Sequence, residues 1–232
     1  MRFRLLICIL CLSVLVLPGC FHEPEEENLS LIKRQLVNYV KSGKYAGEIA
    51  AVVDEAKDFL EARVAASASE NTGKVAIVLD IDDTAISGMP NLLANDFGLI
   101  KGGRCTIPKG PCGWSAWQER AEAPVIAPTL ELSRVAKKLG FAVFFISGRH
   151  EKYRVATERN LRAAGYESWD GLILRTVEDK YPSEADFKAP ARGKLEQEGY
   201  VIVLNMGDQE SDLAGGYAER AFKLPNPFYL IP

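Results

Sequence analysis

The sequence predicts an α/β fold: a doubly wound parallel sheet with a small cap insertion and an N-terminal helical extension. One observation is a set of short apolar runs without polar alternation, which is typical of strands covered on both faces of a sheet. A second is that helical segments alternate with these runs, as they do in parallel sheets. The expected strands are 75–79, 141–146, 172–174 and 201–204, and the expected helices between them are 129–139, 153–164 and 191–199.

The first 19 residues have the pattern of an export signal. A short basic stretch precedes an apolar run at 5–17, which is too short for a comfortable bilayer span and has the length of a signal-peptide core. The run ends in L-P-G-C at 17–20, which resembles a bacterial lipobox with Cys20 as the acylated residue. We therefore expect a lipoprotein signal at 1–19 and a lipid anchor on a bacterial membrane. The outer membrane is favoured if the cell is Gram-negative, with the chain facing the periplasm or the surface. A plain secretory signal or an uncleaved anchor is the alternative.

Three further segments follow the signal. Residues 20–28 are polar and acidic, which indicates a solvated tether. Apolar residues recur at helical spacing within 29–73, so two amphipathic helices are expected there, with packing as their role. The α/β core should occupy 74–232, and its long insertion at about 85–128, rich in Gly, Pro and Trp, should form the cap.

The cysteines fit an exported chain. Cys8 and Cys11 leave with the signal and Cys20 carries lipid, which leaves Cys105 and Cys112. Two thiols in one Gly- and Pro-rich loop of an exported protein predict a disulfide. Two unpaired, half-buried thiols are the alternative.

The charge balance of the chain bears on one class of partner. The chain has 28 Lys and Arg against 31 Asp and Glu, a formal net charge of −3. That balance gives no electrostatic reason to expect a nucleic acid polymer.

Chemically reactive side chains follow the predicted strands. Asp80, Asp82 and Asp83 come after the first strand and S-G-R-H at 147–150 after the second, while Asp208 and Asp212 come after the fourth. Lys188 precedes the helix expected before that fourth strand. Because ligands of such sheets bind at the carboxyl ends of the strands, these residues should meet in one site.

The residue types at this edge indicate phosphoryl transfer. Clustered carboxylates cannot all stay ionised without a cation, and ligands that are oxygen alone suit Mg²⁺. A carboxylate can also accept a phosphoryl group covalently. Ser147 and Lys188 supply a hydroxyl group and a positive charge that can hold phosphate oxygens.

These motifs resemble those of a known family. V-L-D-I-D-D-T at 78–84, F-F-I-S-G-R at 144–149, D-F-K at 186–188 and N-M-G-D-Q-E-S-D-L at 205–213 are similar to the four ordered motifs of haloacid dehalogenase (HAD) superfamily phosphatases. The detail is closest to the plant-acid-phosphatase-like, class B–C branch, which includes bacterial lipoprotein acid phosphatases. Two more stretches fit that branch, P-C-G-W-S-A-W at 111–117 and K-L-P-N-P-F-Y at 223–229.

The resemblance implies a role for each motif residue. Asp80 would be the nucleophile, and Asp82 would protonate the leaving alcohol and then activate water. Mg²⁺ would be held by Asp80, the backbone carbonyl of Asp82 and Asp208, with Asp212 close by. Ser147 and Lys188 would bind the phosphoryl group, and Arg149 would either orient phosphate or form a structural ion pair. Asp83 would support the loop.

The implied activity is that of an acid phosphatase on small phosphomonoesters. A 5′-nucleotidase-type specificity is an alternative, and a non-catalytic binding or storage lipoprotein is another, because some relatives are storage proteins. Some of those relatives lack the nucleophilic Asp, whereas this chain has Asp80. Phe97, Trp114 and Trp117 in the cap could stack on a leaving group, although packing of the cap onto the core is favoured. His150 is expected to be a loop residue.

Overall fold

The computed structural model describes residues 27–66, 73–176, 178 and 181–232. The predicted signal peptide, the lipobox with Cys20 and most of the tether lie outside the described residues.

Five parallel strands form one sheet in the order β3-β2-β1-β4-β5. The strands are β1 (Lys74–Leu79), β2 (Ala142–His150), β3 (Gly171–Arg175), β4 (Tyr200–Gly207) and β5 (Arg220–Lys223). The sequence predicted the first four. It did not predict β5, because that edge strand is only four residues long, begins and ends with a charged residue, and buries Phe222 alone.

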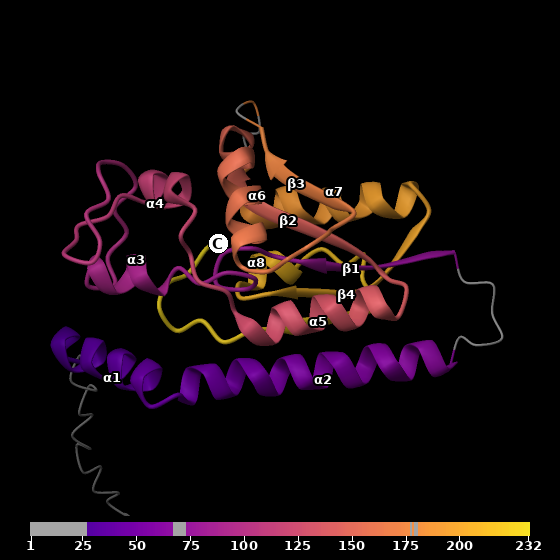
Figure 1. Ribbon diagram of the computed structural model, residues 1–232, viewed down its shortest axis with the longest axis horizontal. Helices are drawn as coiled ribbons and strands as arrows, with labels where there is room; N and C mark the ends of the chain where they lie inside the picture. Colours follow the sequence, from indigo (N-terminus) through magenta and orange to yellow (C-terminus); the bar gives the residue numbers. More distant parts are fainter. Residues whose placement is uncertain (1–26, 67–72, 177, 179–180) are drawn as a thin grey trace, which may run out of the picture.

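Helices cover both faces of the sheet (Figure 1). Ile77 and Leu79 of β1 face the core that α5 (Ala127–Lys138) and α6 (Arg154–Ala163) help to build. The alternate residues Ala76 and Val78 face α7 (Glu184–Gln197) on the other side. The doubly wound α/β fold predicted from the sequence is confirmed.

Helix α7 begins earlier than predicted, which changes the position of Lys188. The expected helix started at 191, but α7 starts at Glu184, so Lys188 lies inside the helix and not before it. Ser183 and Asp186 form a reciprocal capping box that satisfies the first free backbone N–H groups. Pro190 lies within the helix, where it removes one backbone donor, and the helix continues past it.

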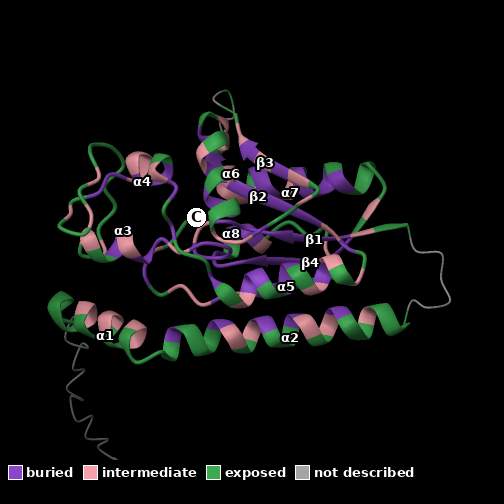
Figure 2. Ribbon diagram, viewed as in Figure 1, coloured by how far each residue is buried: buried purple, intermediate pink, exposed green. Residues whose placement is uncertain are grey.

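The N-terminal helices form an extra layer on the α5 side of the sheet (Figure 1). Helix α1 (Leu29–Lys41) buries no residue fully, whereas α2 (Lys44–Ala66) buries one apolar stripe and exposes its outer side (Figure 2). That stripe comprises Tyr45, Ile49, Val53, Ala56 and Leu60. Within the described ranges no helix has both the length and the apolar character needed to cross a membrane.

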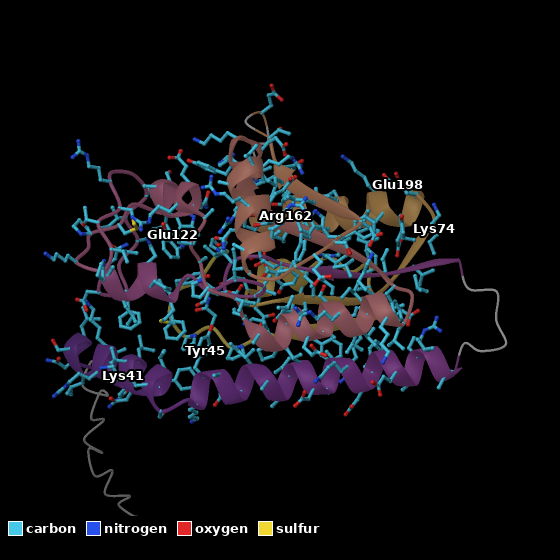
Figure 3. All side chains as sticks on the ribbon, in the orientation of Figure 1. Lys41, Tyr45, Lys74, Glu122, Arg162 and Glu198 are labelled. Atoms are coloured by element: carbon cyan, nitrogen blue, oxygen red, sulfur yellow. A yellow bond between two sulfur atoms is a disulfide. The ribbon has the colours of Figure 1, made fainter. Side chains whose placement is uncertain are left out.

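The insertion after β1 forms a cap beyond the carboxyl ends of the strands (Figure 1). It contains α3 (Met89–Ala94), a long loop and α4 (Trp114–Arg120). Cys105 and Cys112 form a disulfide in that loop (Figure 3). Asn95 fixes the loop to α3, because its side chain accepts a hydrogen bond from the Cys112 N–H at 2.8 Å and donates one to the Cys112 carbonyl at 2.8 Å.

The packing of α2 on the core gives a stability prediction. Leu60 has 0% exposure, so Leu60→Ala should lower the free energy of unfolding by about 2–5 kcal/mol in urea titrations. Val64 lies on the same helix with 36% exposure and is the matched control. Val64→Ala should change the free energy of unfolding by less than about 0.5 kcal/mol. Equal effects of the two substitutions would show that α2 is not part of the core.

Candidate active site

The carboxyl ends of the central strands open into one pocket of about 680 Å³. Asp80 and Asp82 follow β1, Ser147 and Arg149 lie at the end of β2, and Asp208 follows β4. Lys188 enters from α7, and Asp212 from the short helix α8 (Glu210–Leu213). All of these predicted site residues line the pocket, whereas Cys105 and Cys112 lie in the cap loop away from it.

Lys188 is held between two carboxylates. Its Nζ donates to Asp80 Oδ1 at 2.5 Å and to Asp212 Oδ1 at 2.6 Å, and all three side chains are buried. Burial alone would lower the pKa of Lys188, but the charges of Asp80 and Asp212 outweigh it and raise that pKa. The residue is therefore a permanent ammonium ion at the floor of the pocket.

The same region fits a divalent cation. Carboxylate oxygens of Asp80, Asp208 and Asp212 lie within 4.8 Å of one another, and all three residues are buried. A donor set made of carboxylates alone is typical of sites for hard cations such as Mg²⁺. The side chain of Asp82 is not part of this group.

Asp82 is paired separately with Arg149. Arg149 donates from Nε to Asp82 Oδ2 at 2.8 Å and from Nη2 to Asp82 Oδ1 at 2.6 Å. Its side chain is 1% exposed and also donates to Thr157 Oγ1 at 3.2 Å. Of the two roles considered for Arg149, the structure shows the ion pair, and the guanidinium is directed at the proposed acid/base residue.

Burial, together with neighbouring negative charge, raises the pKa values of two acids in this group. Burial raises the pKa of Asp80 well above its usual range, and the nearby Asp212 and Asp208 add to this effect against the opposing effect of Lys188. Burial, together with the charge of Asp212, raises the pKa of Asp208 from 3.8 to about 6. A bound cation would oppose this effect, because positive charge favours the ionised form of both carboxyl groups.

Asp83 supports the loop after β1, as expected. It is buried, and its backbone has a φ of 57°, a left-handed conformation that Asp adopts more readily than most residues. Its side chain accepts hydrogen bonds from Gly88 N at 2.8 Å and from Tyr229 Oη at 2.8 Å. Burial raises the pKa of Asp83 from 3.8 to about 7, and the charge of Asp208 acts in the same direction.

Sequence reasoning missed three neutral residues around Asp208. Asn226 Nδ2 and Gln209 Nε2 each donate to Asp208 Oδ2 at 2.6 Å, and Tyr229 Oη lies 3.4 Å from the same oxygen. Asn226 and Tyr229 belong to the stretch 223–229, which the sequence singled out without a role. It also missed Arg192, which is fully buried and donates to the backbone carbonyl of Asp212 at 2.7 Å.

The outer wall of the pocket is largely apolar. Trp114 and Phe97 of the cap line it, together with Leu92, Leu99 and Tyr153. Trp117, on the same cap helix as Trp114, is buried in the core cluster and does not line the pocket. His150 was expected to lie in a loop, but it is the exposed last residue of β2 and lines the pocket.

Comparison with known proteins identifies the family and the fold. A family model described as HAD superfamily, subfamily IIIB (acid phosphatase) matches residues 23–232. Acid phosphatase 1 of Solanum lycopersicum is 34% identical over 215 residues, which cover 89% of this chain and 80% of that protein. Vegetative storage protein 1 of Arabidopsis thaliana is 35% identical over 156 residues, which cover 67% of this chain and 55% of that protein. The fold is also that of the class C acid phosphatase from Bacillus anthracis, with a TM-score of 0.64, 22% identity and 86% of each chain covered.

The raised pKa values predict an unusual pH dependence of stability. Between about pH 4 and pH 7, Asp83 is protonated in the folded chain and ionised in the unfolded one, and Asp208 behaves likewise up to about pH 6. The folded state binds more protons in this window, so each group lowers the free energy of unfolding as the pH rises, by up to about 1.4 kcal/mol per pH unit. Urea titrations in EDTA should show this decrease from pH 5 to pH 7.5.

Two additions to that experiment identify the cause. Mg²⁺ at pH 7.5 should restore stability, because a cation replaces the lost protons, and Asp83→Asn should show a shallower decrease. If the free energy of unfolding rises steadily from pH 5 to pH 7.5 in EDTA and does not respond to Mg²⁺, Asp83 and Asp208 do not have raised pKa values in the folded chain.

Proposed function

The chain belongs to the acid phosphatase subfamily IIIB of the HAD superfamily, and on that basis we propose that it hydrolyses small phosphomonoesters with Mg²⁺ through a phosphoaspartate at Asp80. The observation that carries the proposal is the buried group of Asp80, Lys188 and Asp212 beside the separately paired Asp82. Asp80, Asp82 and Lys188, which we propose as nucleophile, acid/base residue and anion-binding cation, line one pocket.

In the first step, a carboxylate oxygen of Asp80 attacks phosphorus. The new oxygen–phosphorus bond forms as the bond to the leaving oxygen breaks, and Asp82 gives its proton to that oxygen. Lys188 fixes the direction of the Asp80 carboxylate through its 2.5 Å contact. With Ser147, it also offers donors to the phosphoryl oxygens.

In the second step, a water molecule hydrolyses the phosphoaspartate. Asp82, now a carboxylate, takes a proton from the water while the water oxygen attacks phosphorus and the bond to Asp80 breaks. Inorganic phosphate leaves, and Asp80 and Asp82 return to their starting states. Arg149 holds Asp82 through both steps, because its two hydrogen bonds fix the orientation of that carboxyl group.

Asp80, Asp208 and the backbone carbonyl of Asp82 would hold Mg²⁺, with Asp212 beside them. When bound, the ion supplies positive charge that neutralises the carboxylates and the transferring phosphoryl group. Of the carboxyl groups of Asp80, Asp82, Asp83, Asp208 and Asp212, those of Asp80, Asp82 and Asp212 form ion pairs with Lys188 or Arg149, and a bound cation would add positive charge beside this cluster.

We propose small phosphomonoesters as substrates on the basis of the family and of a pocket of about 680 Å³, a volume in the range of small-molecule sites. The walls contributed by Phe97, Leu99 and Trp114 favour an apolar or planar leaving group. A 5′-nucleotidase-type specificity is one form of the same proposal.

The central test replaces Asp80 and removes the metal. Asp80→Asn should lower kcat for 4-nitrophenyl phosphate and for nucleoside monophosphates by at least about 10³-fold, because the nucleophile is lost. Asp82→Asn should lower it by about 10²–10⁴-fold, and EDTA should abolish turnover until Mg²⁺ is returned. Asp58→Asn, on the exposed side of α2, should have no effect.

Two results would count against this function. Turnover that survives Asp80→Asn would exclude the phosphoaspartate route. The wild-type protein could also bind Mg²⁺ and yet hydrolyse none of a broad panel of phosphomonoesters. That result would favour a non-catalytic binding or storage role, and the relatives of this chain include a storage protein.

We also propose that Cys20 carries a lipid anchor, on the evidence of the L-P-G-C pattern at 17–20. In bacteria fed labelled palmitate, the full-length chain should carry label and sediment with membranes, and Cys20→Ala should lose the label. Cys8→Ala is the matched control and should keep it, because Cys8 lies in the part that is removed. An unlabelled wild-type chain would support the plain secretory signal.

A further inference from the structure

The last residues of the chain, 225–232, fold back against the ends of β1 and β4, and we call them the C-terminal segment (Figure 1). Two of its side chains reach acids of the site. Asn226 donates to Asp208, and Tyr229 donates to Asp83. These contacts are not part of the chemistry described above, in which Asp208 appears only as a metal ligand.

Hydrogen-bond donors surround the carboxylate of Asp208. Its Oδ2 accepts from Asn226 Nδ2 and Gln209 Nε2, both at 2.6 Å, and Tyr229 Oη is 3.4 Å away. Its Oδ1 accepts from Thr84 Oγ1 at 3.2 Å. Contacts on both oxygens fix the plane of the carboxylate, so it cannot rotate freely.

The C-terminal segment is itself fixed in place. Asn226 Oδ1 accepts from Phe228 N at 2.9 Å, which forms a tight turn that presents the Asn226 amide to Asp208. Gln209 connects the two sides, because its Nε2 binds Asp208 and its Oε1 accepts from Ile231 N at 2.9 Å. Ser211 Oγ adds a bond to the Ile231 carbonyl at 2.9 Å.

Aromatic packing anchors the segment to the rest of the molecule. The ring of Phe228 stacks on Phe97 of the cap at 5.9 Å and meets Tyr45 of α2 edge-on at 5.1 Å. Tyr45 points from α2 towards the body of the protein (Figure 3). Tyr39 of α1 lies 6.4 Å from the same ring. Three parts of the chain therefore hold the residue next to Tyr229.

We propose that Asn226 and Tyr229 are positioning residues that hold Asp208 and the loop at Asp83 ready for the divalent cation. This inference rests on the proposed function, because it assumes that Asp208 binds the metal. Hydrogen-bond partners hold a metal-ligating side chain in the orientation that binds the metal, so that side chain loses less conformational freedom on binding. Loss of such a partner typically weakens metal affinity by about 10–100-fold.

The test measures Mg²⁺ binding directly, by isothermal titration calorimetry on the purified, metal-stripped protein. Asn226→Ala should raise the dissociation constant for Mg²⁺ by about 10–100-fold, because Asp208 loses a hydrogen-bond donor at 2.6 Å. Tyr229→Phe keeps the ring and removes only the hydroxyl group, so its effect should be smaller and in the same direction. Tyr200→Phe, at the far end of β4, is the matched control and should not change binding.

Kinetics provides a second measurement that separates positioning from chemistry. At saturating Mg²⁺, kcat and KM of both variants should return to within a few-fold of wild type, while the Mg²⁺ concentration needed for half-maximal rate should rise. Melting temperatures in EDTA check folding. Because Asn226→Ala also removes the acceptor for Phe228 N, Tyr229→Phe decides the matter if Asn226→Ala does not fold.

Each result has one meaning. If wild type binds Mg²⁺ and Asp208→Asn does not, but Tyr229→Phe and a folded Asn226→Ala bind as wild type does, this inference is wrong and the proposed function stands. If kcat stays low at saturating Mg²⁺ while affinity is unchanged, the segment does not act by positioning, and the inference is again wrong. If wild type binds no Mg²⁺, both proposals are wrong.

Discussion

The placement of one ammonium ion, that of Lys188, between two buried carboxylates governs the rest of the site. Removing a charged group from water is costly unless it is paired and hydrogen-bonded, and breaking such a pair leaves a charge uncompensated. Both contacts of Lys188 depend on α7 holding a fixed position against the sheet. The capping box that starts α7 and the apolar side chains Phe187, Ala191 and Leu195 that pack it are therefore part of the active site in a physical sense.

The site divides its charges into two groups that do not share a partner. Lys188 contacts Asp80 and Asp212, whereas Arg149 contacts Asp82. Each carboxylate is therefore held in a fixed direction by its own cation. Lys188 orients Asp80 and Arg149 orients Asp82, although the two acids are two residues apart on one strand end.

The sequence predicted most of what depends on local pattern. Buried strands appear as apolar runs, and ligands placed directly after them meet at one edge because the strands are parallel, so Asp80, Ser147 and Asp208 could be brought together in advance. Strand β5 has no such run. Helix α7 contains Pro190, and the sequence predicted a helix only after that proline, so its first turns were missed. These two errors come from elements whose structure is decided by tertiary packing and by capping.

The contacts that could not be predicted join distant parts of the chain. They involve either uncharged side chains or a side chain that could bind more than one kind of partner. Arg149 could serve phosphate or a carboxylate, and only the approach of β1 to β2 selects Asp82, 67 residues away. Asn226 and Tyr229 carry no charge or spacing that indicates a metal site. Their role depends on the path of the C-terminal segment, which the aromatic contacts of Phe228 determine.

The ring cluster of Tyr39, Tyr45, Phe97 and Phe228 has a practical consequence for anyone who shortens this chain. Helices α1 and α2 lie outside the α/β core and look removable, yet two of the four rings belong to them. Cutting after α2 to leave the α/β core alone would expose Phe228 and loosen the turn that carries Asn226. A shortened version should therefore begin no later than Asn28, whose side chain accepts from Ser30 N at the start of α1.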